Sequence, residues 1–226
     1  MFLTCDNQTM PRRTDAYRGL AQPSRLRVMY ELLERPGQAL AELAEATGLH
    51  ENTLRDHLRV LEAEGYAVRV TEHRGTRGRP RDLFHPAGPD NPVAAKRIEE
   101  AKRHGDFMRS VMLHEDGEGT DSDVAHQFDA LYEHLDEVGL EPQIDEESLT
   151  VQLAPCAFHD LVADRMPMLC HVHAELVRGV LVQARGPLEV ERLLPLVTPH
   201  ECRILLQRTD AASKTAATAD AASRDS

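Results

Sequence analysis

The 226-residue sequence predicts an α+β protein with two folded domains. Three observations predict this fold class. Short apolar stripes with the period of a helix recur three times before residue 65. Two short alternating strands follow and enclose a tip rich in Gly and Arg. Beyond a Gly- and Pro-rich segment at residues 86–92, longer helical patterns alternate with short strands.

The three early helices are each followed by a glycine. We expect these helices over residues 23–35, 39–47 and 51–64. The glycines are Gly37, Gly48 and Gly65, which suit the left-handed backbone that ends a helix. In the third helix, Leu54, Leu58 and Leu61 form the buried stripe. A helix, a turn that contains glycine and a second helix are typical of a helix-turn-helix.

Two short strands complete this unit. They are expected over residues 66–71 and 82–85. The tip between them reads Arg-Gly-Thr-Arg-Gly-Arg-Pro-Arg over residues 74–81. A basic, Gly-rich hairpin directly after the third helix indicates a winged helix-turn-helix.

The second half predicts a separate, small α+β domain. Helices are expected over residues 92–113, 124–138, 157–165 and 169–184, and strands over 149–153, 188–193 and 202–207. The helix over 124–138 ends at Gly139 and has apolar residues at heptad spacing, namely Val124, Phe128, Leu131, Leu135 and Val138. The expected division is a flexible leader (1–14), the winged helix-turn-helix (15–88), a linker helix and loop (89–123), a helix with the cysteine-containing α+β domain (124–208) and a disordered tail (209–226).

Hydropathy and charge limit the function classes. No apolar run approaches the roughly 20 residues that span a bilayer, and no secretory signal is evident, so we expect a cytoplasmic chain without a membrane partner. A start at Met10 instead of Met1 would shorten the leader. The net charge is −12, yet residues 11–90 hold 13 Arg against 12 acids, whereas residues 91–226 hold 13 Lys or Arg against 25 acids. The acidity therefore lies outside the half that we expect to meet a polyanion.

The third predicted helix presents a polar face opposite its leucines. Short polar groups near the start of a recognition helix meet base edges, and longer cations reach phosphates. Asn52, Thr53 and Arg55 fit the first role, and Arg59 fits the second. We expect this face to bind a double-stranded DNA operator, with a merely solvated helix face as the competing interpretation.

The wing adds four arginines that have no acidic residue between them. These are Arg74, Arg77, Arg79 and Arg81, and we expect no local acidic partner to neutralise them. On a Gly-rich tip they would clamp phosphates or enter a minor groove. A flexible, solubilising loop is the alternative interpretation.

Three cysteines, Cys156, Cys170 and Cys202, lie in the second half, whereas Cys5 lies in the leader. Disulfides are disfavoured in a cytoplasmic chain, so metal or redox roles gain weight. Cys156 precedes a predicted helix, whose dipole favours a thiolate, and Cys170 is expected to start the next helix with His173 one turn further on. The spacing matches no compact metal motif, so three ordinary buried cysteines remain an alternative.

Several segments resemble known regulators. Residues 21–29 and 51–65 resemble the first helix and the recognition helix of ArsR-type winged-helix regulators, and residues 78–84 resemble the wing of a narrower branch, the Suf-type iron–sulfur repressors. In the second half, residues 153–158, 169–173 and 201–205 are similar to the cluster-binding half of that branch. There a Cys-Pro-aromatic element, a Cys-x-x-His element and a late Cys occur in the same order.

The resemblance implies a homodimeric repressor with an iron–sulfur cluster, either [2Fe–2S] or [4Fe–4S], in a C-terminal sensor domain. Its ligands would be Cys156, Cys170, Cys202 and His173, with His159, His171 and His200 as alternatives for the fourth position. Residues 92–113 and 124–138 would form the helical dimerisation region on a roughly palindromic operator. The chain departs from the family because proline precedes Cys156 instead of following it, and because Met166-Pro-Met168 replaces a more polar stretch.

Other interpretations of the cysteines stay open. Zinc, a redox-active thiol or no metal at all would each keep the DNA-binding function. A Cys-His enzyme with Cys170 as nucleophile is disfavoured, because no oxyanion hole or orienting acid is evident in the sequence. We therefore expect a regulator and not an enzyme.

Overall fold

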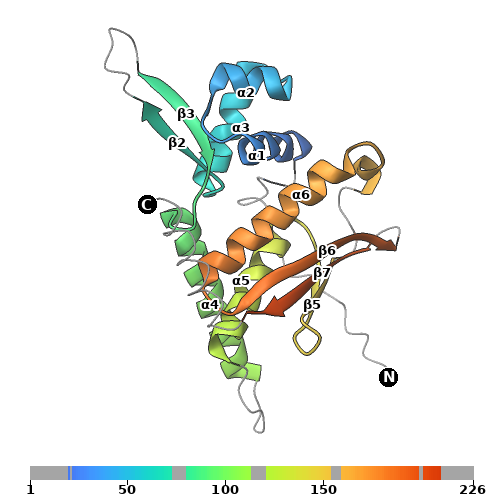
Figure 1. Ribbon diagram of the computed structural model, residues 1–226. Helices are drawn as coiled ribbons and strands as arrows, with labels where there is room; N and C mark the ends of the chain where they lie inside the picture. Colours follow the sequence, from blue (N-terminus) through green and yellow to red (C-terminus); the bar gives the residue numbers. More distant parts are fainter. Residues whose placement is uncertain are drawn as a thin grey trace, which may run out of the picture.

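The computed structural model describes residues 20, 22–72, 80–112, 121–153, 159–198 and 201–209 (Figure 1). The described part is mixed α and β, as predicted, with one sheet in each half. The predicted leader lies outside these residues, and so does the predicted tail apart from Thr209.

The N-terminal half packs three helices against a small sheet. Its elements are α1 (Pro23–Glu34), β1 (Gln38–Ala39), α2 (Leu40–Thr47), α3 (Glu51–Ala63), β2 (Ala67–Glu72) and β3 (Arg81–Pro86). The three helices begin and end within one residue of the predicted bounds. Leu26, Leu43 and Leu54, one from each helix, are completely buried in the shared core. The helical periodicity of the sequence thus identified the core-facing sides correctly.

Glycine ends these helices where the sequence predicted. Gly48 follows α2 with φ +66°, the left-handed cap that we expected. After α1, Gly37 has φ +81°, and the side-chain amide of Gln38 donates to the carbonyl oxygens of Glu31 and Arg35, each at 2.8 Å. These bonds satisfy carbonyls that a helix end leaves open.

The small sheet is antiparallel with strand order β1-β3-β2. Strands β2 and β3 confirm the two predicted strands of the wing. Strand β1 was not predicted, because two residues are too few to show an alternating pattern. Residues 73–79 of the wing tip lie outside the described residues.

The C-terminal half begins with two helices that pack together. Its elements are α4 (Pro92–Met112), α5 (Ser122–Glu137), β4 (Pro142–Asp145), β5 (Thr150–Leu153), α6 (His159–Ala184), β6 (Leu188–Thr198) and β7 (Glu201–Arg208). The guanidinium of Arg109 on α4 donates to both carboxylate oxygens of Asp129 on α5, each at 2.8 Å. A Cβ on Gly105 would lie 2.1 Å from the same carboxyl group, so glycine permits this close approach.

Helix α6 corrects the sequence analysis. We predicted two helices over 157–165 and 169–184, but one helix runs from His159 to Ala184. A proline inside a helix removes one backbone hydrogen bond, at a cost of about 3 kcal/mol. Here α6 packs against α1, α5 and the second sheet. That burial outweighs the lost bond, since each buried aliphatic side chain contributes about 2 kcal/mol.

The second sheet is antiparallel with strand order β4-β5-β7-β6. Strands β5, β6 and β7 were predicted, although β6 continues to Thr198, past the predicted end at Leu193. Strand β4 was missed because its sequence, Pro-Gln-Ile-Asp, contains a single aliphatic residue and starts with proline. Figure 1 shows α6 crossing between α1 and the β6–β7 pair.

A buried glutamine joins three of these elements. Gln127 on α5 is completely buried, and its amide nitrogen donates to the carbonyls of Leu181 and Leu188, each at 3.0 Å. Its amide oxygen accepts from the backbone N–H of Leu188 at 2.7 Å. One side chain therefore satisfies backbone groups at the end of α6 and the start of β6.

Replacing this glutamine should destabilise the protein. Gln127→Ala leaves buried backbone groups without partners, and we expect the free energy of unfolding to fall by about 3 kcal/mol. Gln143→Ala, on the exposed side of β4, is the matched control and should change it by less than about 0.5 kcal/mol. Urea denaturation of both variants measures the difference. Equal effects would contradict the structural role of Gln127.

Candidate functional site

The polar face of α3 is exposed in the structure. Asn52, Thr53, Arg55 and Arg59 are all accessible to solvent, while Leu54, Leu58 and Leu61 are buried on the opposite side. The imidazole Nδ1 of His50 accepts from the backbone N–H of Asn52 at 3.3 Å and caps the helix. The face predicted to read DNA is therefore free of intramolecular packing.

The two arginines of this face are held by neighbours on the same helix. Arg55 donates to Asn52 Oδ1 at 2.8 Å and to Glu51 at 2.7 Å. Arg59 donates to Asp56 at 2.8 Å. Exposed ion pairs of this kind contribute little to stability, so phosphate groups can replace the carboxylates at little cost.

At the base of the wing, the structure corrects one expectation. Arg81 does have an acidic partner, because its guanidinium lies 2.5 Å from Glu42 on α2. Sequence distance concealed this pair, since the two residues meet only when α2 packs beside β3. The other wing arginines, Arg74, Arg77 and Arg79, lie outside the described residues.

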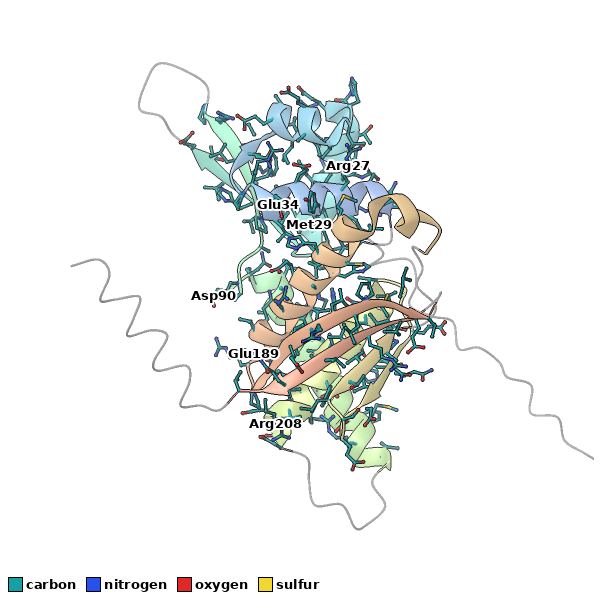
Figure 2. All side chains as sticks on the ribbon, turned by 45° about the vertical axis from the view of Figure 1, so that its right-hand side comes forward. Arg27, Met29, Glu34, Asp90, Glu189 and Arg208 are labelled. Atoms are coloured by element: carbon teal, nitrogen blue, oxygen red, sulfur yellow. The ribbon has the colours of Figure 1, made fainter. Side chains whose placement is uncertain are left out.

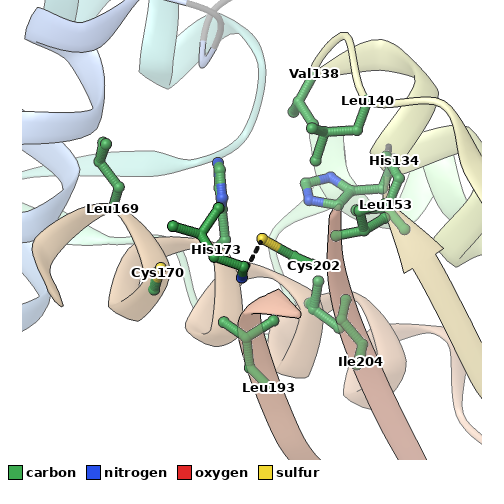
Figure 3. Close-up of a pocket in the computed structure, with 13 residues that line it drawn as sticks. His134, Val138, Leu140, Leu153, Leu169, Cys170, His173, Leu193, Cys202 and Ile204 are labelled. Carbon is green, nitrogen blue, oxygen red and sulfur yellow. Dashed lines mark hydrogen bonds between the residues drawn. The ribbon is translucent and has the colours of Figure 1, made fainter. Parts of the chain in front are cut away.

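A second candidate site is an apolar pocket between α5, α6 and the second sheet (Figure 3). Cys170 and His173 reach it from α6, and Cys202 reaches it from β7. The enclosed volume is about 30 Å³, space for one or two water-sized atoms. The structure thus brings three of the predicted metal-site residues together, although they are far apart in sequence.

Backbone strain directs an N–H group at one of these thiols. Strand β6 has an irregular register between Leu194 and Thr198, and within it Leu196 adopts φ +50°. The backbone N–H of Leu196 donates to Cys202 Sγ at 3.4 Å. Non-glycine residues rarely adopt this conformation, and such strain is concentrated at functional sites. N–H donors to sulfur stabilise thiolates and tune iron–sulfur centres.

Cys170 lies in the middle of α6 and not at a helix start, which corrects the sequence analysis. The dipole of a helix N-terminus therefore does not act on it. Burial raises the pKa of the Cys170 thiol, and the nearby Cys202 raises it further. Two thiolates this close repel each other, so a cation between them would favour the deprotonated pair.

The histidines near Cys170 face different surroundings. His173 lines the pocket, and burial lowers its pKa to about 4, which keeps its ring neutral at pH 7. His171 instead contacts α1, with its Nε2 3.4 Å from Glu34 and its ring 5.9 Å from that of Tyr30. His171 therefore does not line the pocket. Cys156, His200 and the side chain of His159 lie outside the described residues.

The sequence analysis missed one histidine of the pocket. His134 on α5 lines it and is only 4% exposed. Burial, followed by the charge of Arg97, lowers its pKa to about 3. The available signal was its position: His134 lies three residues after Leu131 and four before Val138, on the apolar stripe of a helix.

A compact cation site of three donors occurs elsewhere in the described residues. Donor atoms of Asp106, His126 and Asp129 lie within 4.8 Å of one another. Arg109 donates to both carboxylates, so its guanidinium already supplies the positive charge there. The described cysteines and histidines of the pocket do not reach this spacing in groups of three. They are spread more widely than a single ion requires.

Comparisons with known proteins bear on the N-terminal half. No curated protein matches the sequence significantly. In the described residues, every helix is too short or too polar to cross a membrane. A family model described as a helix-turn-helix domain matches residues 20–70, from just before α1 to within β2. The match is ArsR-like and supports a winged-helix, DNA-binding transcriptional regulator.

Proposed function

We propose that this regulator senses an iron–sulfur centre, or the redox state that determines it, through its C-terminal cysteines. The observation that carries the proposal is the shared pocket of Cys170, Cys202 and His173. Thiolate and imidazole are the ligands that such centres take in proteins. The resemblance to Suf-type repressors adds Cys156 as a further thiolate.

The chemistry of the donors fits this group. Cys170 and Cys202 are both half-buried free thiols, and Cys202 already accepts a backbone N–H. An iron–sulfur cluster supplies a group whose presence reports iron supply and oxidation. The core of a cluster is larger than the enclosed 30 Å³, so holding one requires the lining side chains to separate. The accessible side of both cysteines leaves room for that adjustment.

Helix α6 provides the connection to the DNA-binding half. It carries Cys170 and His173 toward the pocket and His171 toward α1. Figure 2 shows α6 against α1 near Met29 and Glu34. A change in how α6 is held by the pocket therefore acts directly on the helix that supports α2 and α3.

We further propose that the protein is a homodimer on a roughly palindromic operator. The heptad residues of α5 are buried within the chain, so they cannot also form the dimer interface. Helix α4 instead exposes three large apolar side chains, Phe107 (63%), Met108 (42%) and Val111 (61%). A second copy covering this stripe would bury it and set the spacing of the two recognition helices.

Metal and sulfide analysis tests the sensing proposal. Protein purified without oxygen should be brown and carry iron and acid-labile sulfide. Cys170→Ser and Cys202→Ser should lose most of the iron, whereas Cys5→Ser should keep it. Operator affinity should differ about 5- to 150-fold between loaded and metal-free protein. Colourless protein with one zinc per chain would favour zinc instead, and unchanged affinity after metal removal would contradict sensing.

Substitutions on α3 test the DNA-binding face. Arg59→Ala should weaken binding to every DNA sequence and lower the salt dependence by about one counterion, because it removes a phosphate contact. Asn52→Ala should relax discrimination at one base pair by about 1–3 kcal/mol. Arg178→Ala, an exposed arginine on α6, is the charge-matched control. If both α3 variants bind selected operator DNA like the parent, the recognition face lies elsewhere.

Two valines of equal exposure test the dimer. Val111→Glu on α4 should dissociate the dimer by placing a charge in the interface, whereas Val182→Glu on α6 should not. Their side chains are 61% and 60% exposed, so simple solvation effects are matched. Light scattering should give Val111→Glu the mass of one 25.3 kDa chain and Val182→Glu twice that mass. A monomeric parent protein at micromolar concentration would exclude the dimer.

A further inference from the structure

We propose that His134 is a ligand of the same centre, which then has two thiolates, Cys170 and Cys202, and two imidazoles, His134 and His173. The inference rests on the proposed function and refines it. It takes His134 in place of Cys156, next to which the sequence departs from the resembling family. The chemical class is a two-iron, two-sulfide centre with mixed sulfur and nitrogen ligands.

His134 enters the pocket from a different element than the other donors. It lies on α5, whereas Cys170 and His173 lie on α6 and Cys202 lies on β7. In the view of Figure 3, the sulfur of Cys202 lies between the rings of His173 and His134. The four donors therefore surround the pocket from three elements, as a centre that fixes their relative positions requires.

The ring of His134 carries an unused nitrogen. Its Nδ1 is buried and has no hydrogen-bond partner among the described residues. Leaving a buried polar atom unsatisfied is costly, and natural proteins seldom do so without a functional reason. Bonding to a metal gives this nitrogen the partner that the protein itself does not supply.

The separation of the donors favours more than one metal atom. Ligand atoms around a tetrahedral zinc ion lie roughly 3.5 Å apart, given zinc–ligand bonds of about 2.0–2.3 Å. No three of the pocket's described donors lie within 4.8 Å of one another. A two-iron core spans a greater distance, and two sulfur with two nitrogen ligands is the ligand set of Rieske-type centres.

Spectroscopy of loaded protein tests the ligand set. Pulsed electron paramagnetic resonance of the reduced centre should show two coupled histidine nitrogens in the parent protein. His134→Leu should remove one of them, together with most of the iron. His171→Leu, the matched control on the α1-facing side of α6, should leave both. Cys156→Ser should retain the centre, and its loss in that variant would overturn the proposed ligand set.

Folding is separated from ligation by two further measurements. Leucine replaces an unsatisfied polar ring in an apolar pocket, so the melting temperature of metal-free His134→Leu should be unchanged or higher. His134→Cys should bind iron again, with a lower reduction potential, because thiolate replaces imidazole. Parent protein without iron would end the proposed function itself. Iron-loaded parent protein with an identical spectrum in His134→Leu would overturn only the role of His134.

Discussion

The two-sided packing of α6 is the constraint on which the arrangement of the whole chain depends. One side of this helix contacts α1, and the others contact α5 and the second sheet. Val172, Leu181 and Ala184 are almost completely buried along it. Because the same rigid element belongs to both cores, neither half can move without the other responding. This joint burial also explains why the helix continues through Pro167.

A second junction lies where α3 ends and α4 and α5 begin their packing. Arg97 donates to the backbone carbonyl of Glu64 at 3.0 Å, and its guanidinium lies 4.8 Å from the centroid of the Tyr66 ring. The Tyr66 ring also lies 6.2 Å from that of His134. Burial raises the pKa of the neighbouring Glu137 to about 7, against the opposing charge of Arg97. The end of the recognition helix is therefore in contact with the wall of the pocket.

The sequence predicted what local patterns determine. The apolar stripe and bounding glycines of α3, and therefore its exposed face, follow from neighbouring residues, and Gly48 has the expected backbone. It could not predict what distant packing decides. The pairing of Arg81 with Glu42 and the burial of His134 depend on elements that meet only in the folded chain. The roles of the cysteines and of α3 remain proposals until measured.

The irregular stretch of β6 has a consequence for the solubility of the folded protein. The strand order leaves β6 at an edge of its sheet, and its apolar run over residues 193–197 could pair with a strand of another molecule. Pro195 in this run offers no N–H, and the bend at Leu196 interrupts the regular spacing of the exposed backbone. The distortion that directs an N–H toward Cys202 therefore also makes this edge a poor template for fibril growth.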